Sequence, residues 1–243
     1  MATVAICDVH GDARGLEQVL RALEPELDPA HVVVFLGDLI DRGPDSKGVL
    51  EQVCGLAERR PGKVEALQGN HEEWLLETWG DFTRHSWLIG MEGLATVASY
   101  DPALADELRA RLKELGPRLV LERTALPYQA FFAALPAAHA RLLREGLRRF
   151  VRTPDVLCVH AGVALGEDPL ADLRALTWGE PDFPDAYRGS QRVVYGHRGD
   201  ALPDGRPRVG PRGTTWGIDT SPLGIVTALR FPDLALFQSQ PRR

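Results

Sequence analysis

"GDLIDRGPDSKG", residues 37–48, directly follows the apolar run "HVVVFL" at residues 31–36. The run is rich in β-branched residues and predicts a buried strand. The next six residues nevertheless include Asp38, Asp41 and Arg42. Ligands of open α/β sheets bind beyond the carboxyl ends of the strands, and carboxylates crowded there are costly unless a positive group lies among them. The segment therefore predicts a site that holds a positively charged group.

The pattern on both sides of this segment predicts a parallel sheet. A short apolar strand begins at Thr3 and ends in "CDVHGD", and "GLEQVLRALEP" (15–25) has apolar residues at helical spacing. A second helix is expected over 46–60 and a third strand in "GKVEALQGNHE" (62–72). This β-α-β-α-β order predicts an α/β fold in which the polar strand ends meet at one edge.

The middle of the chain has a different character. Helices are expected over 101–116 and 136–150, with few strand signals between them, so we interpret residues 81–152 as a helical insertion within a single domain spanning 1–243. Strands return in 155–163, 192–197, 214–221 and 224–231. Residues 198–213 are rich in Gly, Pro and Arg and predict an exposed loop.

Composition narrows the class of protein. The 243 residues are 44% hydrophobic and 26% charged, as in ordinary globular proteins, and the net charge of −6 disfavours a nucleic-acid partner. No run reaches transmembrane length, and the N-terminus lacks a basic region followed by an apolar one, so we expect no membrane association and a cytoplasmic location. The three cysteines have no metal or disulfide spacing and are expected to be small buried hydrophobes.

Seven polar residues follow the predicted strands. They offer hard oxygen atoms and imidazoles but no thiolate, a set that suits Mn, Fe or Zn better than Ca or Mg. Their number suits two ions that share a bridging carboxylate, for which we expect Asp38. The seven residues are Asp8, His10, Asp38, Asn70, His71, His160 and His197.

Each of these residues is a weak signal by itself. A lone histidine at a strand end is more often structural, and "GD" after a strand is more often a turn. The combination is far more specific, because four of the seven histidines in the chain lie in short segments that directly follow apolar runs.

The segments "DVHG", "GDLIDRG", "GNHE", "VHAG" and "YGH", in this order, resemble the phosphoprotein phosphatase family of the calcineurin-like metallophosphoesterases, and its bacterial branch most closely. The resemblance covers about residues 3–230 and is most specific in the first 75. It implies a β-sandwich flanked by helices, with the metals at the sheet edge.

The resemblance also implies a ligand set and a mechanism. Asp8, His10 and Asp38 would hold one metal. Asp38, Asn70, His160 and His197 would hold the other. Two divalent ions are expected, manganese first, with iron or zinc as alternatives. A metal-bridging hydroxide would attack phosphorus directly, with no covalent phosphoenzyme.

The resemblance implies roles for three further residues. Arg42 would bind the substrate phosphate through its planar guanidinium, and His71 would be the general acid that protonates the leaving oxygen. Asp41 would orient His71 and raise its pKa. Structural alternatives stay open, namely a turn-capping role for Asp41 and a surface ion pair for Arg42.

The chain departs from the family pattern in three places. Relatives carry an arginine two residues after a tryptophan, whereas "LTWGEPDF" has Glu180 there, and Arg174 or Arg188 is a candidate replacement. Arg198 stands where threonine is usual, either as a phosphate contact or pointing to solvent. "DTG" becomes "DTS" at residues 219–221, where we interpret Asp219 as mainly structural. Substrate choice is the property that these departures affect.

The expected function is a metal-dependent protein phosphatase, a phosphomonoesterase acting on phosphoserine and phosphothreonine, with phosphotyrosine or small phosphoesters as further substrates. The alternative is symmetrical hydrolysis of diadenosine tetraphosphate to two ADP. An inactive binding protein is disfavoured because every expected ligand and His71 are present, and a nuclease is disfavoured by Arg42 and the acidic charge.

Overall fold

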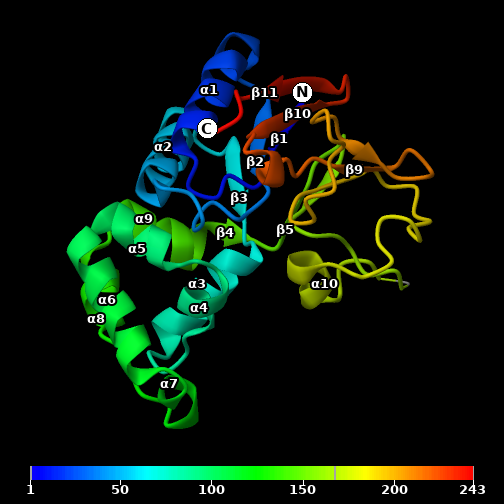
Figure 1. The fold of residues 1–243 in the computed structure, drawn as a ribbon. Coiled ribbons are helices and arrows are strands. Elements are labelled where there is room, and N and C mark those ends of the chain that lie inside the picture. The colour runs from blue at the N-terminus through cyan, green and yellow to red at the C-terminus, as the bar shows by residue number, and fades with distance from the viewer. Residues whose placement is uncertain (1, 167, 243) are drawn as a thin grey trace.

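A computed structural model describes residues 2–166 and 168–242 and contains two sheets that pack face to face (Figure 1). The six-stranded first sheet has the order β11-β10-β1-β2-β3-β4, and the five-stranded second sheet has the order β5-β6-β7-β9-β8. The strands of the first sheet are β1 (Thr3–Ile6), β2 (Val32–Phe35), β3 (Val64–Leu67), β4 (Leu147–Arg148), β10 (Thr227–Phe231) and β11 (Ala235–Gln238). Those of the second are β5 (Phe150–Arg152), β6 (Leu157–Val159), β7 (Val193–Tyr195), β8 (Arg208–Val209) and β9 (Thr215–Gly217).

The predicted β-α-β-α-β unit is confirmed. β1, β2 and β3 pair in parallel, with Thr3 opposite Val32 and Val33 opposite Val64. Helices α1 (Ala13–Leu23) and α2 (Ser46–Arg59) form the crossovers and cover the outer face of the first sheet (Figure 1). The side chains of Asp12 and Asp45 accept backbone N–H groups at the two helix N-termini, so both crossover helices start immediately after the polar strand ends.

Successive side chains along the strands point to opposite faces of the first sheet and form two apolar layers. In β1, Val4 and Ile6 point to the helices, whereas Ala5 packs between the sheets together with Trp216 of β9 and Phe231 of β10. All three cysteines are free, and Cys7 and Cys158 are buried between the sheets as expected, whereas Cys54 of α2 is only half-buried because it lies near the surface of its helix. The predicted α/β fold, a β-sandwich flanked by helices, is thereby confirmed.

Helices follow β3 and form an arm that extends away from both sheets (Figure 1). Aromatic rings pack its interior, where Trp87 contacts Tyr128, Phe131 and Phe132. The helices are α3 (Asn70–Gly80), α4 (Ser86–Gly90), α5 (Leu94–Tyr100), α6 (Pro102–Leu115), α7 (Arg118–Leu121), α8 (Tyr128–Ala134) and α9 (Ala137–Arg141), followed by a π-helical turn at Leu142–Gly146.

The helix predicted over 136–150 is too long. Helical structure ends at Gly146, and the next residues form β4, which pairs in parallel with β3, and then β5, which opens the second sheet. β8 and β11 were also not predicted. The remaining helical elements are α10 (Leu173–Trp178) and the 3-10 turns at Glu24–Glu26 and Ser221–Leu223. None of the helices in the described part of the chain is both long and apolar enough to cross a membrane.

Candidate metal centre

The predicted site residues meet at one edge of the sandwich, supplied by both sheets. Asp8 and His10 follow β1, Asp38 follows β2, and His160 and His197 follow β6 and β7. β1 and β2 are parallel, as are β6 and β7, so their carboxyl ends lie at the same edge. Asn70 and His71, predicted at a strand end, instead form the first turn of α3, which is separated from β3 by two residues.

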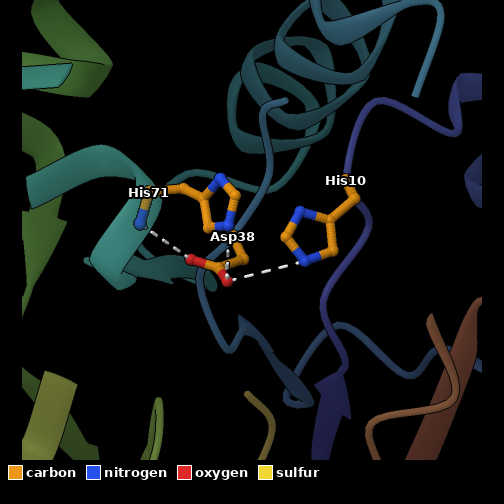
Figure 2. A group of neighbouring side chains, drawn as sticks. All are labelled: His10, Asp38 and His71. Carbon is orange, nitrogen blue, oxygen red and sulfur yellow. Dashed lines mark hydrogen bonds and ion pairs between the residues drawn. The ribbon is translucent and has the colours of Figure 1, made fainter. Parts of the chain in front are cut away.

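One cluster consists of His10, Asp38 and His71, whose donor atoms all lie within 4.8 Å of one another. Figure 2 shows both imidazoles turned toward the Asp38 carboxylate. His10 Nε2 lies 3.6 Å and His71 Nε2 3.9 Å from Asp38 Oδ2. All three side chains are buried, so this is an enclosed site rather than a surface ion pair.

A second cluster consists of Asp38, His160 and His197. His160 Nε2 lies 3.5 Å from Asp38 Oδ1, and the rings of His160 and His197 are 5.0 Å apart. Asn70 joins this cluster through Oδ1, 3.2 Å from His160 Nε2. Asp38 therefore presents one oxygen to each cluster.

Asp8 lies outside both clusters but beside them. Its Oδ2 accepts the backbone N–H of His197 at 2.9 Å, and its buried Oδ1 has no hydrogen-bond partner among the residues that the structure describes. Burial, then the carboxylates of Asp219 and Asp38, raises the pKa of Asp8 well above its usual value. A nearby cation would relieve this crowding of negative charge.

The donor atoms fit divalent cations. His160 Nδ1–H donates to the carbonyl oxygen of Leu36, so Nε2 is the ring nitrogen available to a cation, and it lies 3.2 Å from Asn70 Oδ1. One cation could contact both of these atoms. The two clusters that share Asp38, together with the Oδ1 of Asp8, unpaired among the described residues, match a pair of metal sites. His71 Nε2 is also buried without a partner in the described residues, so it is available to donate or accept a proton.

Burial and charge set the protonation states that ligands need. Burial lowers the pKa of His10 to about 3 and that of His197 to about 4. Burial alone would raise the pKa of Asp38, but the surrounding histidines, His160 first, outweigh it and hold that pKa below its usual range. Neutral imidazoles around an ionised carboxylate are the forms that bind a metal.

Two glycines allow the backbone to lie close to the site carboxylates. A Cβ at Gly69 would lie 2.0 Å from Asp38 Oδ1, and one at Gly196 would lie 1.9 Å from Asp8 Oδ1.

The backbone at the site is conformationally strained. Left-handed backbone conformations that non-glycine residues rarely adopt are concentrated here. They occur at His10, Asp38, Asp41, Arg42 and His197, with φ from 43° to 70°.

Asp41 holds His71 in place. His71 Nδ1 lies 2.8 Å from Asp41 Oδ2, and Asp41 also accepts hydrogen bonds from Trp87 Nε1 and Thr96 Oγ1. Burial raises the pKa of Asp41. Burial would lower the pKa of His71, but the carboxylates of Asp38 and Asp41 outweigh it and raise that pKa. The imidazole is thus oriented at Nδ1 and free at Nε2.

Sequence reasoning missed Glu72, although it lies in the "GNHE" segment. This fully buried carboxylate accepts the backbone N–H groups of Asp38, Leu39 and Gly69 at 2.8–3.0 Å. It therefore joins the loop after β2 to the loop before α3. Trp87 and Thr96 were also missed, because nothing in their local sequence links the arm to Asp41.

The two predicted phosphate-binding arginines lie in loops of different sheets, Arg42 after β2 and Arg198 after β7. Arg42 is exposed, and its Nη1 donates to His10 Nε2 at 3.0 Å. Arg198 donates to the carbonyl oxygens of Glu180 and Pro181. Of the two candidate replacements, Arg174 lies over the Trp178 ring, and Arg188 donates to backbone carbonyls of Asp185 and Tyr187.

Comparisons with known proteins agree with this geometry. The family model for the calcineurin-like phosphoesterases matches residues 1–209. The chain is 29% identical over 244 residues to bis(5'-nucleosyl)-tetraphosphatase PrpE [asymmetrical] of Bacillus subtilis, covering 96% of this chain and 92% of the relative. It is 39% identical to serine/threonine-protein phosphatase 1 of Salmonella typhimurium, but over only 83 residues, 34% of this chain and 35% of the relative.

A solved structure supports the fold. A protein serine/threonine phosphatase from Saccharomyces cerevisiae superimposes with a TM-score of 0.56 at 16% identity, covering 100% of this chain and 81% of that chain. The family model matches most of the chain, and the solved structure shares the fold. The chain belongs to the calcineurin-like metallophosphoesterase family.

Proposed function

We propose that this phosphoesterase is a two-metal hydrolase of dinucleoside tetraphosphates that cleaves them asymmetrically. The observation that carries the reaction class is Asp38, which gives one carboxylate oxygen to each of two histidine clusters. The full-length similarity to an asymmetrical tetraphosphatase supports the substrate class. It favours this substrate over the protein phosphatase expected from sequence and over symmetrical cleavage.

The residues that would hold two divalent cations are those predicted from the sequence. They are Asp8, His10 and Asp38 for one ion and Asp38, Asn70, His160 and His197 for the other. When bound, the ions supply Lewis-acid charge that activates water and neutralises phosphate oxygens. Manganese is the first candidate, with iron and zinc as alternatives.

Two arginines bind and orient the phosphate chain in this proposal. The exposed Arg42 exchanges its contact with His10 Nε2 for a forked contact with phosphate oxygens. Arg198 follows His197 directly and provides a second cationic contact from the opposite sheet. Cations on both sides of a polyphosphate suit a substrate that carries several negative charges.

His71 is the general acid in this proposal. Asp41 accepts Nδ1–H of the protonated ring, so Nε2 is the atom that delivers a proton to the leaving oxygen. The hydrogen bond from Nδ1–H to the Asp41 carboxylate favours the protonated ring. The proton neutralises charge that develops on the leaving oxygen, and it matters most when the leaving group is poor, as the alcohol of a phosphomonoester is.

A phosphoserine or phosphothreonine side chain is the second candidate substrate. The specific observation in its favour is the 83-residue similarity to a serine/threonine phosphatase at 39% identity. The same His71 and Arg42 would act on a phosphomonoester, because the chemistry at phosphorus and the leaving oxygen is shared.

The test compares kcat/KM of the manganese-loaded protein on diadenosine tetraphosphate and on a phosphothreonine peptide. Products are separated by anion-exchange chromatography. We expect preference for the dinucleotide and formation of AMP and ATP. Two ADP would overturn asymmetrical cleavage, and preference for the peptide would overturn the substrate class. Asp38→Asn, prepared in parallel, identifies any contaminating activity.

A further inference from the structure

A pair of tryptophans leads away from the metal centre. The Trp178 ring, at the end of α10, lies 6.5 Å from the His197 ring, and the Trp74 ring lies 5.0 Å from that of Trp178. Trp74 is only three residues beyond His71 in α3. Both indoles are half-buried, so each keeps part of its surface accessible beside the site.

Contacts hold both rings in position. Trp178 Nε1 donates to Glu73, which also pairs with Arg149 at 3.5 Å. Gly90 of α4 lies against Trp74, because a Cβ there would be 2.9 Å from the indole. A rigid aromatic surface loses little conformational freedom when a planar ligand stacks on it.

Trp74 borders open space on the side away from the metal ligands that it follows in α3. A surface hollow of about 570 Å³ begins at Trp74, large enough for a nucleoside. Ile89 and Val120 in this hollow are 59% and 64% exposed, so its apolar side chains are not covered within the protein. The lining includes Trp74, His85, Ile89, Gly90, Val120 and Arg123.

Guanidinium groups lie beside the indoles. The Arg174 guanidinium lies 5.6 Å above the Trp178 ring. Arg84 and Arg123 line the hollow and pair with Glu77 and Asp81. Indole and guanidinium planes together are the groups on which proteins stack nucleobases. A peptide substrate has no general need for such a surface.

We propose that Trp74 and Trp178 form a nucleobase subsite, on which the base of a nucleotide stacks while its phosphate chain lies at the metal centre. The inference rests on the proposed function, because it assigns a place to the nucleoside of that substrate. Trp178 connects the subsite to His197, and Trp74 forms its border with the hollow.

The test is competitive inhibition of p-nitrophenyl phosphate hydrolysis by AMP and by ribose 5-phosphate, which differ only in the base. In the wild type we expect AMP to bind at least about fivefold more tightly, the lower end for one stacked base. Trp74→Ala should raise the inhibition constant of AMP toward that of ribose 5-phosphate. The constant of ribose 5-phosphate should change less than twofold.

Two further variants separate stacking from folding. Trp74→Phe retains an aromatic face and should retain most of the preference for AMP. Trp79→Phe is the matched control, because Trp79 lies on the same helix but stacks on Phe132 inside the arm; it should leave the preference unchanged. Loss of the preference in the control, or equal weakening of both inhibitors by Trp74→Ala, would overturn the subsite.

The same assay distinguishes failure of the subsite from failure of the proposed function. A preference for AMP that depends on Trp74, in a protein that does not cleave diadenosine tetraphosphate, would support the subsite and reject the substrate. Equal inhibition of the wild type by AMP and ribose 5-phosphate would reject the subsite even if the dinucleotide is cleaved.

Discussion

The two clusters that share Asp38 are assembled over very different distances along the chain. His10, Asp38 and His71 come from one β-α-β-α-β unit of the first sheet and all lie within residues 10–71. His160 and His197 come from the second sheet, after the whole arm has intervened. The first cluster thus follows from local topology, whereas the second requires the two sheets to pack in one particular alignment.

Asp38→Asn removes the carboxylate that both clusters use and has the largest expected effect. Bound metal should fall for both sites, and activity should drop by more than the roughly 100-fold caused by losing an outer partner of a metal ligand. Metal analysis and kcat on p-nitrophenyl phosphate check this. Asp45→Asn, which keeps a good helix cap in the same segment, is the control. Wild-type activity in Asp38→Asn would contradict the shared role.

His71→Asn distinguishes a proton donor from a ligand in the first cluster. If His71 is the general acid, its removal should lower kcat by roughly 100- to 10,000-fold for an alkyl phosphate. For p-nitrophenyl phosphate, the loss should be much smaller, because a good leaving group needs little protonation. Bound metal should stay constant. Equal losses on both substrates, together with released metal, would make His71 a ligand instead.

His197→Ala affects only the second cluster. We expect loss of about one metal equivalent and a fall in kcat of roughly 10- to 100-fold, by comparison with losing a metal-supporting contact. The melting temperature of the protein should change little, because His197 lies in a loop and its side chain is only partly buried. Loss of both equivalents would show that the two clusters do not fill independently.

Glu72→Gln has the smallest expected effect on the reaction rate. It weakens the contact between the loop after β2 and the loop before α3. The amide cannot accept all three backbone N–H groups, and unsatisfied buried donors cost about 1–3 kcal/mol each. Urea denaturation should show a loss of that order. Glu77→Gln, an exposed position on the same helix, should change the free energy of unfolding by less than about 1 kcal/mol.

The sequence predicted the parallel strands β1, β2 and β3 better than the strands that follow the arm. β1, β2 and β3 are apolar runs with polar ends, a strong local signal. β4 and β5 were hidden, because "LLREGLRRF" continues a helical pattern and the strands have only two and three residues. Their pairing is a property of the packed sheets rather than of local propensity.

The support of the site was less predictable than its polar residues. His10 and Asp38 stand out after apolar strands, whereas Thr96 and Trp87 belong to an arm with its own helical pattern. Their contact with Asp41 depends on tertiary packing across 46 and 55 residues of sequence separation. Glu72 was visible in its motif, but its three backbone partners emerge only when the two loops meet.

The pairing of β3 with β4 has a consequence for how such enzymes diversify. The arm leaves the first sheet after one strand and returns to it at the adjacent strand. Because the sheet already holds these ends together, lengthening or shortening the arm adds little chain-closure entropy. An exchanged arm would have to preserve the contacts of Trp87 and Thr96 with Asp41. During evolution, arms with different recognition surfaces can therefore replace one another while the reaction centre stays unchanged.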